Sequence, residues 1–165
     1  MGLTLVLTKQ DELNEIAELA RVIWNDHYPA IVGQEQVDYM LDKMYSQDAL
    51  LDQLINKKQM FYFIVDGEKK LGFISISYSI DTQEIFIHKF YILTQKQKSG
   101  VGSAVMGLIQ DLYPNAKFYR LTVNRQNYKS INFYFKNGFI IDRVEDFDIG
   151  NGYLMNDFIM VKRVL

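Results

Sequence analysis

The spacing of apolar residues changes period once along the chain, near residue 60, and this change limits the folds that the sequence can adopt. Before it, apolar residues recur at helical spacing, which predicts three helices, over Asp11 to about Tyr28, around Val37–Tyr45, and over Asp48–Asn56. After it, runs rich in strand-forming residues predict three consecutive strands, over Met60–Val65, Leu71–Ser79 and Glu84–Leu93. The chain therefore combines a helical first part with a sheet.

The remaining segments alternate between the two periods. We predict an opening strand over Leu3–Thr8, helices over Gly100–Tyr113 and Tyr128–Asn137, and strands over Phe118–Asn124, Phe139–Phe147 and Tyr153–Val164. Consecutive strands favour antiparallel hairpins, and a helix between two strands favours a crossover. This order predicts an α/β fold with a central mixed, mostly antiparallel sheet and helices on both faces. No repeat or Pro/Gly-rich linker interrupts it, so we expect one domain over residues 1–165.

Composition excludes several classes of protein. The 165 residues include no cysteine, which excludes disulfides, zinc–thiolate sites and a thiol nucleophile and fits a reducing compartment. No apolar run reaches the ~20 residues of a membrane span, and the first residues lack the basic segment of a secretory signal. A net charge of −2 argues against nucleic acid as a partner. We therefore expect a cytoplasmic protein without membrane or nucleic-acid partners.

Charge is unevenly distributed along the chain. Residues 89–138 contain eight basic residues and one acidic residue, Asp111, so the rest of the chain is strongly acidic. Such a division favours an anionic ligand on the basic part and a cationic ligand on the acidic part, although uneven surface composition alone would give the same pattern.

The segment between the strand ending at Leu93 and the next helix is suited to bind phosphate. It reads Gln97-Lys98-Ser99-Gly100-Val101-Gly102. Glycines let the backbone approach an anion closely, and the positive end of a helix dipole offers free N–H groups to a pyrophosphate. The segment matches neither the dinucleotide pattern, because residue 105 is Val, nor the Walker pattern. As an isolated pair, the two glycines would more often mark a simple helix start.

Three segments in the same order resemble the GNAT (general control non-repressed related) N-acetyltransferase family. Gln97 to Gly102 resembles its Q/R-x-x-G-x-G/A motif, His88–Leu93 its fourth strand, and Asn127–Phe139 its N-x-x-A-x-x-F-Y-x-x-x-G-F segment. Thr94 and Ser130 depart from the residues usual there, which are Pro and Ala. The resemblance implies the acyl-CoA N-acyltransferase fold, acetyl-CoA as co-substrate and no metal. It implies coenzyme A contacts at Phe90, Tyr91, Ile92, Gln97, Lys98, Ser99, Gly100, Val101, Gly102, Ser103, Asn127, Lys129 and Ser130.

Acetyl transfer needs a neutral amine, a stabilised oxyanion and a proton for the departing thiolate. The resemblance implies Tyr134 as the acid, and a backbone N–H near Tyr91–Leu93 for the oxyanion. Without the motif, Tyr134 would read as a core residue. Strand alternation places Glu84 and His88 on one face, where either could act as the base. A chain of waters without a single base is the third alternative.

The sequence says less about the amine that would accept the acetyl group. Trp24, His27 and Tyr28 lie together at the end of the first predicted helix and are candidates to line its pocket. Glu35, Asp38 and Asp42 form an acidic row that suits a polyamine, but the row lies opposite the apolar stripe and more simply reads as a solvated face. We predict acetylation of a small primary amine. The alternatives are acetylation of peptide N-termini and a non-catalytic coenzyme A-binding module. By analogy of fold, the last hairpin offers a strand for a homodimer.

Overall fold

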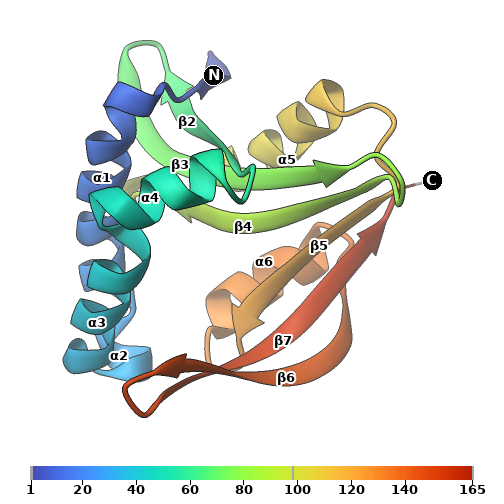
Figure 1. The fold of residues 1–165 in the computed structure, drawn as a ribbon. Coiled ribbons are helices and arrows are strands. Elements are labelled where there is room, and N and C mark those ends of the chain that lie inside the picture. The colour runs from blue at the N-terminus through green and yellow to red at the C-terminus, as the bar shows by residue number, and fades with distance from the viewer. Residues whose placement is uncertain (1, 98, 165) are drawn as a thin grey trace. The chain divides into compact units, whose positions relative to one another are not determined.

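The computed structural model of the chain describes residues 2–97 and 99–164 (Figure 1). Its residues form two compact units. Unit 1 contains Met1–Ser77 and Lys89–Tyr113, and unit 2 contains Tyr78–His88 and Pro114–Leu165. Strands β3 (Lys69–Ser79) and β4 (Glu84–Ile92) cross the boundaries between the units. Each unit is described by itself.

The strands of unit 1 are antiparallel neighbours. Strand β1 (Leu3–Leu7) pairs with β2 (Met60–Asp66), and β2 pairs with β3. The turn between β2 and β3 contains Gly67 with a φ of 62°, as expected for Asp-Gly in a tight hairpin. Both faces of β2 and β3 are apolar, and the fully buried side chains include Phe61, Phe63, Ile64, Phe73, Ile74 and Ile76. These residues form the core of unit 1.

Four helices of unit 1 lie between β1 and β2 in the chain. They are α1 (Leu13–His27), α2 (Pro29–Val32), α3 (Gln34–Tyr45) and α4 (Gln47–Ile55), and the short helix η1 (Gln10–Glu12) precedes them. Helix α1 contacts α3 and α4 and buries its predicted apolar face, including Leu13, Ile16 and Ala20. Pro29 ends α1 as predicted, but it also begins the unpredicted turn α2, since proline is well suited to a first helical position.

The rest of unit 1 follows β4. A short helix, η2 (Thr94–Lys96), leads to α5 (Val101–Leu112), which packs against β1. Helix α5 buries Val101, Val105, Met106 and Ile109, which recur at helical spacing.

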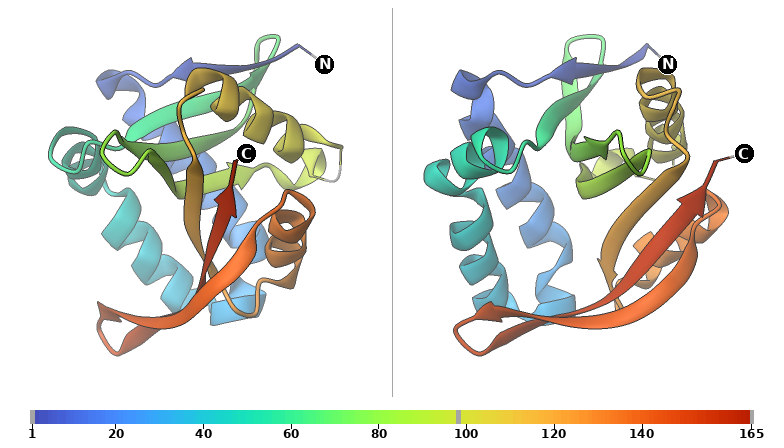
Figure 2. Two further views of the ribbon diagram at one scale, coloured as in Figure 1. Left: turned by 90° about the vertical axis from the view of Figure 1, so that its right-hand side faces the viewer. Right: turned by 45° about the vertical axis from the view of Figure 1, so that its right-hand side comes forward.

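Unit 2 contains the first part of β4, then β5 (Phe118–Asn124), α6 (Tyr128–Lys136), β6 (Ile140–Gly150) and β7 (Tyr153–Arg163). Strand β5 is parallel to β4, β7 is antiparallel to β5, and β6 closes a hairpin with β7. Both views of Figure 2 show α6 along one side of the β6–β7 hairpin. Asn151 and Gly152 have φ values of 54° and 78° in the hairpin turn, conformations that Asn and Gly tolerate.

Hydrogen bonding gives the strand order β1-β2-β3-β4-β5-β7-β6. The sheet is mixed, because β4–β5 is parallel whereas β1–β2, β2–β3, β5–β7 and β6–β7 are antiparallel, which confirms the predicted fold class. The predicted boundaries of the helices and strands differ from the observed ones by a few residues at most. The short helices η1, α2 and η2 were not predicted from the sequence, because each is too short to show the periodic spacing of apolar residues that indicates a helix.

Candidate active site

The predicted phosphate loop of unit 1 is shaped by its own side chains. Gln97 Nε2 donates to the carbonyl oxygen of Ile92 at 2.9 Å, and Ser99 Oγ donates to that of Lys96 at 2.6 Å. Gly100, with a φ of 81°, precedes the first turn of α5 in the left-handed conformation that favours glycine. The first N–H groups of a helix have no partner within it, so the turn over Val101, Gly102 and Ser103 offers donors to an anion. Lys98 lies outside the described residues.

The end of β4 is held by aromatic side chains of unit 1. The ring of Tyr91 lies 5.8 Å from Trp24, 6.4 Å from Tyr28 and 5.6 Å from Phe73, measured between ring centroids. Tyr45 joins the group at 5.9 Å from Trp24, and burial raises the pKa of its hydroxyl. Trp24 is almost fully buried, so it packs in the core, whereas His27 and Tyr28 remain partly exposed. Phe90 and Ile92, on either side of Tyr91, are partly buried.

Gly72 on β3 allows the backbone of β4 to come unusually close. A Cβ atom at Gly72 would lie 2.1 Å from the carbonyl oxygen of Tyr91 and 2.9 Å from the Cα of Ile92. Leu93 N donates to Leu71 O at 2.8 Å directly beside this approach. The absence of a side chain at Gly72 therefore sets the path of β4 over the residues from which we expect the oxyanion donor. The sequence alone gave no sign of this role, because a lone glycine in a strand has many explanations.

We expect Gly72→Ala to lower the free energy of unfolding by about 1–3 kcal/mol, since the new methyl group displaces the Tyr91–Ile92 backbone. Gly107→Ala is the matched control, because a Cβ at this helical glycine meets no atom within 4 Å; it should leave stability unchanged or raise it by about 1 kcal/mol. Urea unfolding of both variants measures the difference. Equal free energies of unfolding in the two variants would show that β4 accommodates the new methyl group without a loss of stability.

Lys89 is not available to an anionic ligand, although it belongs to the basic part of the sequence. Its Nζ donates to Gln53 Oε1 at 2.7 Å and to Gln59 Oε1 at 3.3 Å. The rings of Tyr45 and Phe61 have centroids 5.6 and 5.5 Å from it. Burial lowers the pKa of this amine to about 7, and the charge of Lys57 acts in the same direction. Lys89 therefore joins α4 and β2 to β4 inside unit 1.

The lowered pKa predicts a stability that depends on pH. Between about pH 7 and pH 10 the unfolded chain keeps a proton on Lys89 that the folded chain has lost, so stability rises with pH. The rise is at most ~1.4 kcal/mol per pH unit. We expect Lys89→Met to remove this part of the slope in urea unfolding from pH 7 to pH 9. Lys69→Met, at an exposed position, should keep the wild-type slope; equal slopes in both variants would contradict the burial of the charge.

In unit 2, Asn127, the residue before α6, and Tyr134 within α6 are both buried and lie seven residues, or two helical turns, apart. Asn127 caps the helix: its side-chain oxygen accepts from Ser130 N at 3.3 Å. The Tyr134 ring lies 5.3 Å from Phe133 and 5.4 Å from Phe139, so packing fixes its position. Lys129 is exposed and Ser130 partly buried on the first turn.

The two residues predicted as bases differ in their surroundings. The Glu84 carboxylate accepts from Arg120 Nε at 3.1 and 3.2 Å, and Arg120 also bonds Asp142 at 3.0 Å. These contacts raise the pKa of Arg120, the bond to Glu84 most of all. Both carboxylate oxygens of Glu84 therefore face the Arg120 guanidinium. His88 is exposed, and its ring lies 4.7 Å from Phe86.

The acidic row on α3 is exposed: Glu35, Asp38 and Asp42 all face solvent, and Asp38 accepts from Gln34 at 2.8 Å. This arrangement supports the reading of the row as a solvated face. Among the described residues, no group of three or more potential ligands is arranged to hold a metal ion. Within the same residues, none of the helices has the length and apolar character required to cross a bilayer.

The chain belongs to the acetyltransferase (GNAT) family, whose model matches residues 15–139. A spermidine N(1)-acetyltransferase from Thermoplasma acidophilum is 25% identical over 159 residues, which cover 93% of this chain and 92% of that protein. The crystal structure of PaiA N-acetyltransferase from Thermoplasma acidophilum in complex with coenzyme A has a TM-score of 0.79 at 24% identity, covering 99% and 100% of the two chains. A GCN5-related N-acetyltransferase from Rhodopseudomonas palustris has a TM-score of 0.76 at 15% identity, covering 99% and 97%. These structures share the fold.

Proposed function

We propose that this acetyltransferase moves the acetyl group of acetyl-CoA directly to a primary amine of a small molecule, with a polyamine such as spermidine as the leading acceptor. The observation that carries the proposal is the match to a spermidine N(1)-acetyltransferase along 93% of the chain. The loop of unit 1 and the buried Tyr134 of unit 2 supply the chemistry that such a reaction needs.

The loop is the proposed site for the coenzyme A pyrophosphate. Gly100 carries no side chain that would shield the N–H groups at the start of α5, and Gln97 ties the loop to the end of β4. The helix dipole adds a favourable interaction with the negative charge. The side chains of Gln97 and Ser99 are already bonded to backbone carbonyls of the loop. The first N–H groups of α5 have no acceptor within the helix, so they remain the donors for a phosphate.

The reaction requires one bond to form and one to break. The neutral amine nitrogen attacks the thioester carbonyl carbon, the carbon–sulfur bond breaks, the nitrogen releases one proton to solvent, and the sulfur takes a proton. We assign that proton to the Tyr134 hydroxyl, because a phenol can donate its proton to a forming thiolate. Packing of the ring against Phe133 and Phe139 holds the Tyr134 side chain in place. No covalent enzyme intermediate is needed, in keeping with a chain without cysteine.

An acceptor panel tests the proposed function. Thiol release from acetyl-CoA should be fastest with polyamines and slower with amino acids and with peptides that have free N-termini. Coenzyme A at 100 times its dissociation constant should stabilise the fold by about 2.7 kcal/mol. Gly100→Val should lose that shift, because a β-branched residue is strained at its positive φ, while Gly107→Ala keeps it. Release with peptides alone would favour the N-terminal acetyltransferase, and a thermal shift without any release would favour the binding module.

Tyr134→Phe should lower kcat by about 10²–10⁴-fold, because it removes the acid and keeps the packed ring. Coenzyme A affinity and the melting temperature should change little. Phe133→Tyr is a useful companion, since it adds a hydroxyl on the same helix without supplying the missing acid. Normal turnover in Tyr134→Phe, under conditions where chemistry limits the rate, would remove Tyr134 from the mechanism.

A further inference from the structure

Strand β1 in unit 1 has a partner strand on one side only. It is the first strand in the order of the sheet, and β2 pairs with it along its inner side. In the part of the chain that the structure describes, no strand lies on the outer side of β1. An unpaired strand edge presents a row of N–H and C=O groups with which another chain can pair. The outer edge of β1 is therefore a potential interaction surface.

The register between β1 and β2 shows which residues present these groups. Thr8 N donates to Phe61 O at 2.9 Å, and Leu7 stands opposite Tyr62. Hydrogen-bonded and non-hydrogen-bonded pairs alternate along an antiparallel ladder, so the even-numbered residues of β1 bond to β2. The residues that direct their backbone N–H and C=O groups outward are therefore Leu3, Leu5 and Leu7.

The side chains of β1 do nothing to prevent pairing at this edge. The strand reads Leu-Thr-Leu-Val-Leu over residues 3–7, without a charge or a proline, and its register with β2 has no shift. Val6 is 46% exposed and Leu7 is 53% exposed. Proteins usually protect a free edge with charged side chains, proline or a bulge. The composition of β1 is instead that of a strand with partners on both sides.

Strand β6 in unit 2, the last in the order of the sheet, has the protection that β1 lacks. Its register with β7 shifts between Ile141 and Arg143 and again between Asp148 and Gly150. Its charged residues are mostly acidic, namely Asp142, Glu145, Asp146 and Asp148 against Arg143. Two copies of β6 paired edge to edge would place these acidic residues against one another. The last hairpin is therefore a poor site for self-pairing, although analogy of fold favoured it.

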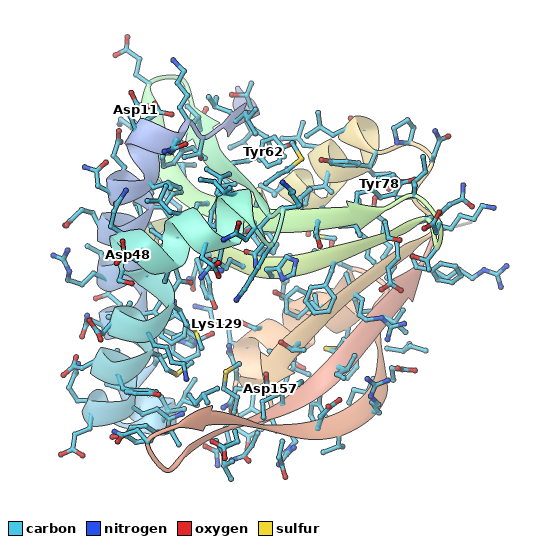
Figure 3. All side chains as sticks on the ribbon, viewed as in Figure 1. Asp11, Asp48, Tyr62, Tyr78, Lys129 and Asp157 are labelled. Atoms are coloured by element: carbon cyan, nitrogen blue, oxygen red, sulfur yellow. The ribbon has the colours of Figure 1, made fainter. Side chains whose placement is uncertain are left out.

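The surface beside the end of β1 is apolar on the side of α5. Tyr62, labelled in Figure 3, stands opposite Leu7, and its hydroxyl lies 3.3 Å from the hydroxyl of Tyr113, which follows α5. The Tyr113 hydroxyl donates to Met60 Sδ at 3.4 Å. Met60 and Leu112, the residue before Tyr113, are both exposed. The free edge thus continues into exposed apolar side chains.

We propose that β1 is the interface of a homodimer in which two copies pair their β1 strands antiparallel, centred on Leu5. In this register Leu5 faces the partner's Leu5, and Leu7 faces the partner's Leu3, so the outward N–H and C=O groups of the two strands bond one another. Val6 faces the partner's Thr4 on the opposite face of the sheet and gains a cross-strand contact. The pairing has twofold symmetry, so it uses the edge of each copy completely and ends at a dimer.

The same register brings opposite charges together at both ends of the paired strands. Asp66 stands opposite Leu3, and its Oδ1 accepts from Gly2 N at 3.1 Å. Gly2 faces the partner's Thr8, so the partner's exposed Lys9 follows at this end, on the face that carries Asp66. Symmetry repeats the pair at the other end. A second copy of the chain therefore complements this edge in both hydrogen bonding and charge.

Sedimentation velocity of the full chain tests the interface. Wild type should sediment as a dimer at micromolar concentration. Leu7→Lys places a charge on the edge and should raise the dissociation constant of the dimer about tenfold or more, since both copies lose a cross-strand apolar pair. Ile140→Lys is the matched control, because it makes the same change at an exposed position on β6 and should leave the dimer intact. The melting temperature of each variant verifies that it is folded.

A charge reversal tests the register. Lys9→Glu and Asp66→Lys should each weaken the dimer, because each places like charges together at both ends, and the loss should shrink at high salt. The double variant Lys9→Glu/Asp66→Lys restores opposite charges and should recover most of the wild-type affinity. The Gly2 bond to Asp66 is lost in the double variant as well, so it cannot account for a recovery. Additive losses in the double variant would contradict the register.

Amide hydrogen exchange identifies the paired residues directly. In the dimer the amides of Leu3, Leu5 and Leu7 should exchange slowly, although they point away from β2. In Leu7→Lys, at a concentration where that variant is monomeric, the same amides should exchange rapidly. The amides of Thr4 and Val6 face β2 and should stay protected in both proteins, which makes them the internal control.

Each of the remaining outcomes counts against the proposal. A wild type that stays monomeric at its highest soluble concentration overturns it, and so do assemblies larger than a dimer. Dissociation by Ile140→Lys with an intact dimer in Leu7→Lys would assign the interface to the last hairpin. If Leu7→Lys fails to fold, the exchange of the outward amides in wild type decides. None of these measurements uses acetyl transfer, so the proposed function and the dimer stand or fall separately.

Discussion

The parallel pairing of β4 with β5 is the constraint on which the arrangement of this protein depends. A tight turn cannot join two parallel strands, so the chain must cross over, and residues 93–117 provide the crossover through α5. The loop before α5 therefore has to begin at the carboxyl end of β4, where a helix N-terminus and a strand end come together. The anion-binding character of this loop follows from the topology, and Gln97 and Gly100 then adjust its shape.

The parts of the fold that depend on local pattern could be predicted from the sequence. The change of period near residue 60, the Asp-Gly turn and the glycines before α5 all act within a few residues. The effects of Gly72, Lys89 and Asp157 could not be predicted, because each depends on partners far away in the chain. Gly72 matters through Tyr91, Lys89 through Gln53 and Gln59, and Asp157, which is 2% exposed, lies beside Arg125, 32 residues away. The ion pair of Glu84 could not be predicted for the same reason, since Arg120 lies 36 residues away.

Lys89 and Asp157, one in each unit, show how buried charges keep a pKa near neutrality. Burial shifts them in opposite directions, because it disfavours the ammonium ion of Lys89 and the carboxylate of Asp157. The hydrogen-bond partners of Lys89 are neutral amide oxygens, and at Asp157 burial outweighs the charge of Arg125, which lowers the pKa of the carboxyl. A neutral partner satisfies the group without cancelling the effect of burial. Arg120 shows the other arrangement, in which carboxylate partners raise the pKa and fix the charge.

The bond from Gln97 to the Ile92 carbonyl also explains why the first position of the family motif accepts two such different residues as glutamine and arginine. Both end in N–H groups at a similar distance from the backbone, and one neutral carbonyl is the acceptor. The bond requires reach and a hydrogen-bond donor at this position and does not require a formal charge. Glutamate has the same length as glutamine, but an ionised carboxylate only accepts hydrogen bonds. It could therefore not donate to the Ile92 carbonyl and would be a poor replacement for Gln97.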